Sequence, residues 1–377
     1  LLTFLANLAT LWHLYPMRIR GIIVITLSIL AAPAIAAIDP NSGIDFVTIG
    51  AINNPAWTGG GSNNNRGSVG YVYNIGKFEV TTAQWAEFMN AALDRPATDR
   101  IPAVQYPSIW GATAVPPANA GGRRYVVPPG RENIPVGGIT WRTAAIFANW
   151  LHNGKATNRE AFLSGAYDVS TFGVGPNGVG FTDQLTRSPG ARYWIPSLDE
   201  WMKAAHYDPN KPNADGTIGG WWQYSTSSDS PILYGPAGQF APGGRPFQAN
   251  GVWTSEAFPG FNPFSIPLGA YTDVVSPWGL YDVAGGTSEW TEGAQQFTGE
   301  LLPRFRYLDG SAWTISNSNG DRVGSLGGSI DPWTSNFATG LRISSSVPAP
   351  GFALIGACVV AGAGWNGRRS RTHGISR

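Results

Sequence analysis

Apolar residues recur at the spacing of an amphipathic helix in three places along the chain. The first place begins at Thr81 or Thr82 and carries Trp85, Phe88 and Met89. Threonine is a favourable N-cap, and steps of three and four residues bring these large side chains onto one face. We therefore predict a helix here, with that face in the core.

Two further helices follow from similar signals. One is predicted to begin at Thr140 and to present an apolar face of Ala and Trp side chains as far as Leu151. Ser197 and Glu200 have the spacing of a capping box, in which each side chain bonds the backbone N–H of the other residue. They predict the start of a short helix that includes residues 201–206.

Strands and loops fill the rest of the central sequence. Residues 71–75 alternate as a strand does, and residues 39–70 suggest a strand followed by a Gly-, Asn- and Ser-rich loop. Residues 95–133 are a long Pro- and Gly-rich excursion. Since no internal repeat or linker divides the sequence, we predict one α+β domain over residues 39–345, loop-rich, with few short strands and short helices.

The N-terminal region has the pattern of a secretory signal. A basic start at Met17 is followed by an apolar stretch over 21–30 and the small-x-small sequence Ala34-Ile35-Ala36. We interpret 17–36 as a signal peptide and 1–16 as a mis-called upstream start. A membrane anchor is the alternative, but the apolar stretch is short and Pro33 interrupts it.

Residues 347–371 combine a Pro-rich start, an uncharged apolar run over 351–364 and an Arg cluster. The run is shorter than the roughly 20 residues that span a bilayer, so we expect no permanent membrane span. The segment resembles a PEP-CTERM sorting tail, with Ala349 in place of the usual Glu. The resemblance implies processing by an exosortase-type sorting machinery and a secreted or cell-surface protein.

Composition supports an irregular domain with an aromatic core. The chain has 49 Gly, 29 Pro and 16 Trp, and 13% of its residues are charged. Without the two ends, residues 38–367 carry a net charge of about −5, from 19 Lys and Arg against 24 Asp and Glu. Such a domain, without basic runs, is a poor nucleic-acid binder. Because the single cysteine, Cys358, lies in the apolar tail, the domain has no disulfide and no thiolate metal site.

Six separated segments share their order and residues with one known family. They read YNIGKFEVT (73–81), IPVGGITW (134–141), RYWIPSLDEW (192–201), GLYDVAGGTSEW (279–290), DGSAW (309–313) and GLR (340–342). Together they resemble the formylglycine-generating, sulfatase-modifying-factor domain. The resemblance implies a C-type-lectin-like fold that is stabilised by bound calcium ions.

The same resemblance locates the chemistry of the family and shows what this chain lacks. The family's enzymes bind copper(I) through two cysteines and use molecular oxygen to oxidise a sulfatase cysteine. Thr314 and Asn319 occupy these two positions here, and residues 38–357 contain no cysteine. Since copper(I) prefers soft thiolates, we expect no copper and no formylglycine synthesis. Iron would require His152 and His206 to act together, and we do not favour that site.

Calcium has better support, because an all-oxygen ligand set suits it. The family's ligand positions correspond to Asp282, Gly285, Thr287 and Glu289, with carbonyl groups from the two central residues. The alternative is that Asp282 caps a turn and Glu289 pairs with a cation such as Arg342.

A second family calcium site begins at positions matched by Asn250 and Gly251. Its further ligands would come from 260–264, where the sequence has no carboxylate.

Three functions are compatible with this sequence. We favour a non-catalytic surface module that binds a protein or a glycan. The alternatives are an oxidoreductase with a non-cysteine site and an accessory factor for secreted sulfatases. The clustered Trp residues could line a groove or belong to the core; they include Trp221, Trp222, Trp253, Trp278 and Trp290.

Overall fold

The computed structural model describes residues 38–238, 248–249, 251, 260–272, 274–313 and 318–347. Residues 1–37 and 348–377, and with them the predicted signal peptide and nearly all of the predicted sorting tail, lie outside the described residues. Within the described ranges, no helix is long and apolar enough to cross a membrane.

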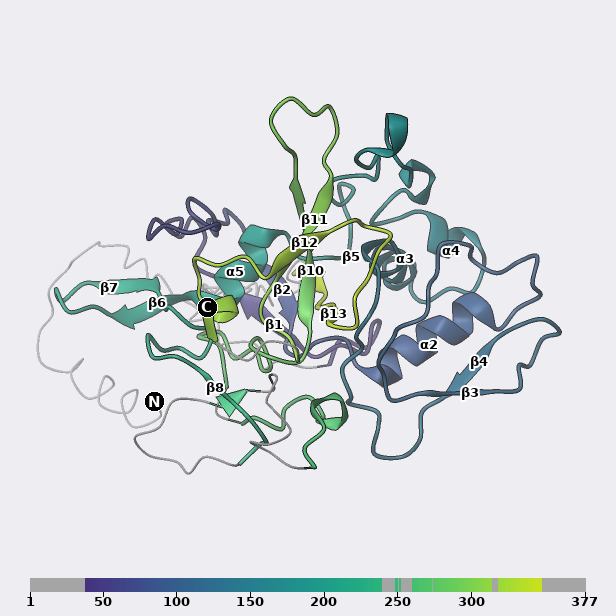
Figure 1. The fold of residues 1–377 in the computed structure, drawn as a ribbon, viewed down its shortest axis with the longest axis horizontal. Coiled ribbons are helices and arrows are strands. Elements are labelled where there is room, and N and C mark those ends of the chain that lie inside the picture. The colour runs from purple at the N-terminus through teal and green to yellow at the C-terminus, as the bar shows by residue number, and fades with distance from the viewer. Residues whose placement is uncertain are drawn as a thin grey trace, which may run out of the picture. The chain divides into compact units, whose positions relative to one another are not determined.

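Two four-stranded sheets organise the domain (Figure 1). The first has the order β1-β2-β14-β5, with all pairs antiparallel. The second has the order β12-β11-β10-β13, and its β10–β13 pair is parallel. The strands of the first sheet are β1 (Phe46–Ile49), β2 (Tyr73–Gly76), β5 (Tyr193–Trp194) and β14 (Ser344–Ser345). Those of the second are β10 (Ser288–Gln295), β11 (Phe305–Asp309), β12 (Gly328–Ile330) and β13 (Thr339–Gly340).

Three small two-stranded sheets complete the strands of the described chain. They are β3 (Thr113–Val115) with β4 (Arg124–Val126), β6 (Tyr207–Pro212) with β7 (Ile218–Trp221), and β8 (Leu233–Tyr234) with β9 (Gln248–Ala249). The first pair lies within the Pro- and Gly-rich excursion, beside the first helix (Figure 1).

Four α-helices lie in the described residues, and the three longer ones begin where the sequence predicts. They are α2 (Thr82–Leu93), α3 (Trp141–His152), α4 (Glu160–Leu163) and α5 (Leu198–His206), with short 3₁₀ turns at Val169–Thr171, Pro176–Gly178, Pro263–Ser265 and Ser318–Asp321. Thr81, Thr140 and Ser197 are the N-caps of the three long helices, and Thr81 and Ser197 form complete capping boxes. These caps satisfy backbone N–H groups that the first turn leaves free.

An aromatic core holds α2 against α3. Trp85 and Phe88 of α2 meet Phe147 of α3 with ring centroids 5.1 and 5.3 Å apart, and Trp150 lies 5.7 Å from Phe88. Packed aromatic pairs contribute about 0.5–1.5 kcal/mol each beyond the burial of their area. Together with the sheets, this core confirms the predicted loop-rich α+β class.

Strand β2 differs from the expectation of alternating burial. Its residues from Tyr73 to Gly76 are all buried, whereas Tyr71 and Val72 before it are exposed. The reason is its position between β1 and β14, with core side chains on one face and polar partners on the other.

Candidate functional site

The glycine-rich segment before β10 turns sharply and is tied to two distant parts of the chain. Asp282 adopts a positive φ of 55°, and its carboxylate accepts a hydrogen bond of 2.6 Å from the Gly269 N–H. The Thr287 N–H donates to Glu79 Oε1 over 3.1 Å. The Gly285 N–H donates to Ser311 Oγ over 2.8 Å. The segment therefore joins the start of α2 to the motif that follows β11.

Glu289 forms a fully buried ion pair. Arg342 donates from Nη2 to Glu289 Oε1 over 2.9 Å and from Nε to both carboxylate oxygens, and the two side chains are at most 1% exposed. The Trp201 indole N–H also donates to Glu289 Oε2. Arg342 is the partner that the alternative to calcium assigned to Glu289.

More buried carboxyl groups surround this pair than Arg342 alone can balance. Burial raises the pKa of Asp282 to about 6 and that of Asp309 to about 8. Burial and the charge of Glu289 raise the pKa of Glu79 well above its usual value, and its Oε2 has no hydrogen-bond partner. Carboxyl groups in this state bind either a proton or a cation.

The predicted second calcium site is described only in part. Asn250 lies outside the described residues, and Gly251 follows β9, where its N–H donates to Ala249 O over 3.2 Å.

Only one of the two family cysteine positions lies within the described residues. Thr314 lies outside the described residues, and Asn319 lies in the 3₁₀ turn at Ser318–Asp321. Beside it, the Asp321 carboxylate accepts from the Tyr234 hydroxyl and from the Ser311 N–H. Burial raises the pKa of Asp321 to about 6. This cluster is built for hydrogen bonding and offers no thiolate ligand.

The two histidines of the domain have separate surroundings. His152 ends α3 and its Nδ1 accepts from the Arg192 N–H over 3.0 Å. His206 ends α5, is buried, and has a pKa lowered to about 3 by that burial. Among the residues that the structure describes, no group of three or more His, Cys, Asp or Glu is arranged to hold a metal ion.

The named Trp residues divide between core and partly exposed positions. Trp290 is fully buried, Trp221, Trp222 and Trp278 are half-buried, and Trp253 lies outside the described residues.

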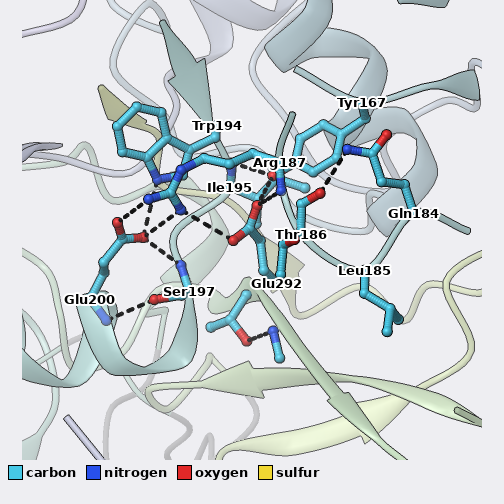
Figure 2. A network of polar contacts seen from close by, with 12 residues as sticks. Tyr167, Gln184, Leu185, Thr186, Arg187, Trp194, Ile195, Ser197, Glu200 and Glu292 are labelled. Atoms are coloured by element: carbon cyan, nitrogen blue, oxygen red, sulfur yellow. Dashed lines mark hydrogen bonds and ion pairs between the residues drawn. The ribbon is translucent and has the colours of Figure 1, made fainter. Parts of the chain in front are cut away.

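A cleft of about 570 Å³ lies on another part of the domain, beside a network that sequence reasoning did not find. At its centre the Arg187 guanidinium lies 4.0 Å from the Trp194 ring centroid and pairs with Glu200 and Glu292, at 3.0 and 3.2 Å (Figure 2). The Tyr167 hydroxyl donates to Glu292 over 2.7 Å. The capping-box pattern identified Glu200 as part of a helix start. No local pattern in the sequence connects Glu200 to Arg187 or Glu292.

Several solved structures and one sequence family are similar to this chain. Similar solved structures include the crystal structure of CarF, at 20% identity and a TM-score of 0.45, covering 81% of this chain and 98% of that one. Treponema denticola variable protein 1 has 18% identity and a TM-score of 0.42, with coverages of 80% and 95%. PvdO from Pseudomonas aeruginosa has 14% identity and a TM-score of 0.42, with coverages of 84% and 100%. No curated protein matches the chain significantly.

The family itself is shown by a sequence match. The model of the FGE-sulfatase family, described as the sulfatase-modifying factor enzyme 1-like domain, matches residues 64–346. This range contains Glu79, the glycine-rich segment before β10, the cluster at Asp321 and the buried Arg342. The match therefore confirms the fold class that the sequence predicts, a loop-rich α+β fold of the sulfatase-modifying-factor type. Because the match extends over most of the 377 residues, the chain belongs to the sulfatase-modifying factor enzyme 1-like domain family.

Proposed function

We propose that this family member is a non-catalytic binding module, secreted or held at the cell surface, that recognises a protein or a glycan. The observation that carries the proposal is the absence of any cysteine from residues 38–357, in a family whose enzymes resemble this chain but act through a cysteine pair. Without thiolates, residues 38–357 lack the soft ligands that copper(I) prefers. The predicted signal peptide and sorting tail support an extracellular location, and the predicted tail supports an exosortase-type partner.

A second candidate is an oxidoreductase that uses a non-cysteine site. The hydrogen-bonded cluster of Tyr234, Asp321 and Ser311 favours it, because buried titratable groups beside a family's catalytic position are candidates for catalysis. A role as accessory factor for secreted sulfatases also agrees with the family. The assay below separates both from the binding module.

The purified domain is expected to leave a cysteine-containing sulfatase peptide unmodified, with or without added copper. Mass spectrometry of the peptide detects conversion to formylglycine, and a family enzyme with both cysteines is the positive control. Turnover above background by this chain would show a non-cysteine oxidase. Stimulation of the control enzyme by this chain would instead favour the accessory role.

Calcium is the metal that fits the donor atoms of this chain. The glycine-rich segment supplies the Asp282 carboxylate and backbone carbonyls at Gly285 and Thr287, and β10 supplies the Glu289 carboxylate, so that all these donors are oxygen atoms. The unpartnered Oε2 of the buried Glu79 adds an acceptor that a cation would stabilise. Since Arg342 already occupies Glu289, we infer that calcium would act mainly through Asp282 and would compete with Arg342 for Glu289. Its role would be structural.

Calcium is therefore expected to raise the melting temperature of the domain. Free calcium at about 100 times its Kd adds about 2.7 kcal/mol to the free energy of unfolding, which corresponds to several degrees. Chelation should remove the gain, Asp282→Ala should abolish it, and magnesium should substitute poorly because it demands tighter octahedral geometry. If melting curves with calcium and with chelator coincide, Asp282 and Glu289 serve only as partners of Gly269 and Arg342.

A further inference from the structure

Several separate elements meet around the cleft beside Arg187. Its walls come from the segment around Ser188, from Trp194 of β5, from Glu292 of β10 and from Ser346 after β14, with Tyr71 at one side. The volume of about 570 Å³ lies within the range of sites that hold small ligands. Nothing in the predicted chemistry of the family cysteines or of calcium uses these residues.

Tyr71 lines one side of this cleft, with the Arg187 guanidinium 5.7 Å from its ring centroid. Its hydroxyl donates to Glu200 Oε1 over 2.7 Å and accepts from Arg187 Nη2 over 2.9 Å. Its ring also meets that of Tyr73 edge-on, with centroids 6.0 Å apart. The side chain is thus fixed at both ends, although the residue remains 44% exposed. A fixed ring loses little conformational entropy when a ligand packs on it.

The two carboxyl groups around Arg187 are also fixed in place by hydrogen bonds. Glu200 Oε2 accepts from the Trp194 indole N–H over 3.1 Å and from the Ser197 N–H over 2.7 Å. Glu292 Oε1 accepts from the Arg187 N–H over 2.6 Å in addition to its bond from Tyr167 (Figure 2). Because the groups of this network already have partners, a ligand meets a preorganised wall and requires no rearrangement.

Charge at this wall is nearly balanced. Two carboxyl groups, Glu200 and Glu292, face the guanidinium of Arg187. Burial raises the pKa of Glu292 to about 7, so below that pH the Glu200 carboxylate alone faces the Arg187 guanidinium and the wall carries little net charge that would attract an anion or a cation strongly. The wall therefore favours a neutral, polar ligand.

We propose that this cleft binds a neutral saccharide unit. The apolar face of a sugar ring would pack on Tyr71, and its hydroxyl groups would exchange hydrogen bonds with the hydroxyls of Ser188 and Ser346 at the edge of the cleft. This inference rests on the proposed binding function, for which it names the ligand class and the place.

The test uses the purified protein and four named trisaccharide probes. Maltotriose and N-acetylated chitotriose are neutral, trigalacturonate is anionic, and the chitosan trisaccharide is cationic. Binding is measured by isothermal titration calorimetry and by saturation-transfer NMR. At least one neutral probe is expected to bind with a Kd in the millimolar range or below, and more tightly than either charged probe.

Variants locate the site. Tyr71→Ala is expected to weaken binding of the neutral probe at least tenfold, because it removes the ring on which the sugar would pack. Ser346→Trp fills the cleft from an exposed position outside the Arg187 network and should also abolish binding. Tyr106→Ala is the matched control, since Tyr106 is 39% exposed and packs on Tyr125 away from this network.

The outcomes separate this inference from the proposed function. If no neutral probe binds, or if Tyr71→Ala and Ser346→Trp bind as tightly as the unchanged protein, the saccharide site is wrong. Preference for a charged probe that both variants lose would also overturn the ligand class, while leaving a binding module in place. Peptide turnover in the formylglycine assay would overturn the proposed function, whatever the saccharide probes do.

Discussion

Arg342→Ala is expected to lower the free energy of unfolding by about 3–5 kcal/mol, because it leaves a buried carboxylate without its cation. Glu289 would keep only the hydrogen bond from Trp201, in surroundings that already hold Glu79 and Asp309. The change also removes donors to the carbonyl oxygens of Gly76 and Tyr281, at 2.9 and 3.0 Å. Domains are stable by about 5–15 kcal/mol, so the loss is a large part of the total.

Urea unfolding measures this loss, and Lys77→Ala is its control. Lys77 pairs with Asp45 over 3.4 Å, but both side chains are partly exposed, so their pair is worth about 1 kcal/mol or less. The double variant Glu289→Gln with Arg342→Met should recover part of the stability, since it removes the unpaired charge. A loss for Arg342→Ala no larger than that for Lys77→Ala would mean that another cation, such as calcium, already balances Glu289.

The parts of the fold that the sequence predicted depend on local signals. The caps at Thr81, Thr140 and Ser197 and the apolar spacing after each of them act within one or two helical turns, so they can be recognised without knowing the fold. Burial of β2 on both faces could not be recognised in this way. It depends on β14, which lies about 270 residues further along the chain.

The same distinction between local signals and contacts of distant residues applies to the candidate sites. The sequence offered both calcium and Arg342 as partners of Glu289, and the contact with Arg342 is present in the structure. The contact of Tyr234 with Asp321 joins residues 87 positions apart, and that of Arg187 with Glu292 joins residues 105 positions apart. Neither pair has a motif of its own, because side chains from separate loops and strands meet only after the chain has folded.

The stability of the domain is expected to fall as the pH rises from about 5 to 8, and Glu292 is expected to carry much of that dependence. Burial, helped by the charge of Glu200, raises the pKa of Glu292 from 4.5 to about 7, in spite of Arg187 and the Tyr167 hydroxyl, which lower it. The folded protein therefore holds a proton that the unfolded chain releases. The stabilising effect of that proton is complete below the unfolded pKa and is lost as the pH passes through the folded pKa.

The contribution of Glu292 to the free energy of unfolding follows from its pKa shift, at about 1.36 kcal/mol for each pKa unit. It comes to about 3 kcal/mol for a side chain as buried as Glu292. Urea unfolding at pH 5, 6, 7 and 8 measures the slope. Glu292→Gln, which cannot ionise, should reduce the slope without removing it, because burial also raises the pKa of Asp309 to about 8. Glu160→Gln, at an exposed carboxyl in the first turn of α4, is the matched control and should leave the slope unchanged. Equal slopes for Glu292→Gln and the unchanged protein would contradict the assignment. The pH dependence would then belong to Asp309, whose pKa burial raises to about 8, and Asp309→Asn would have to remove it.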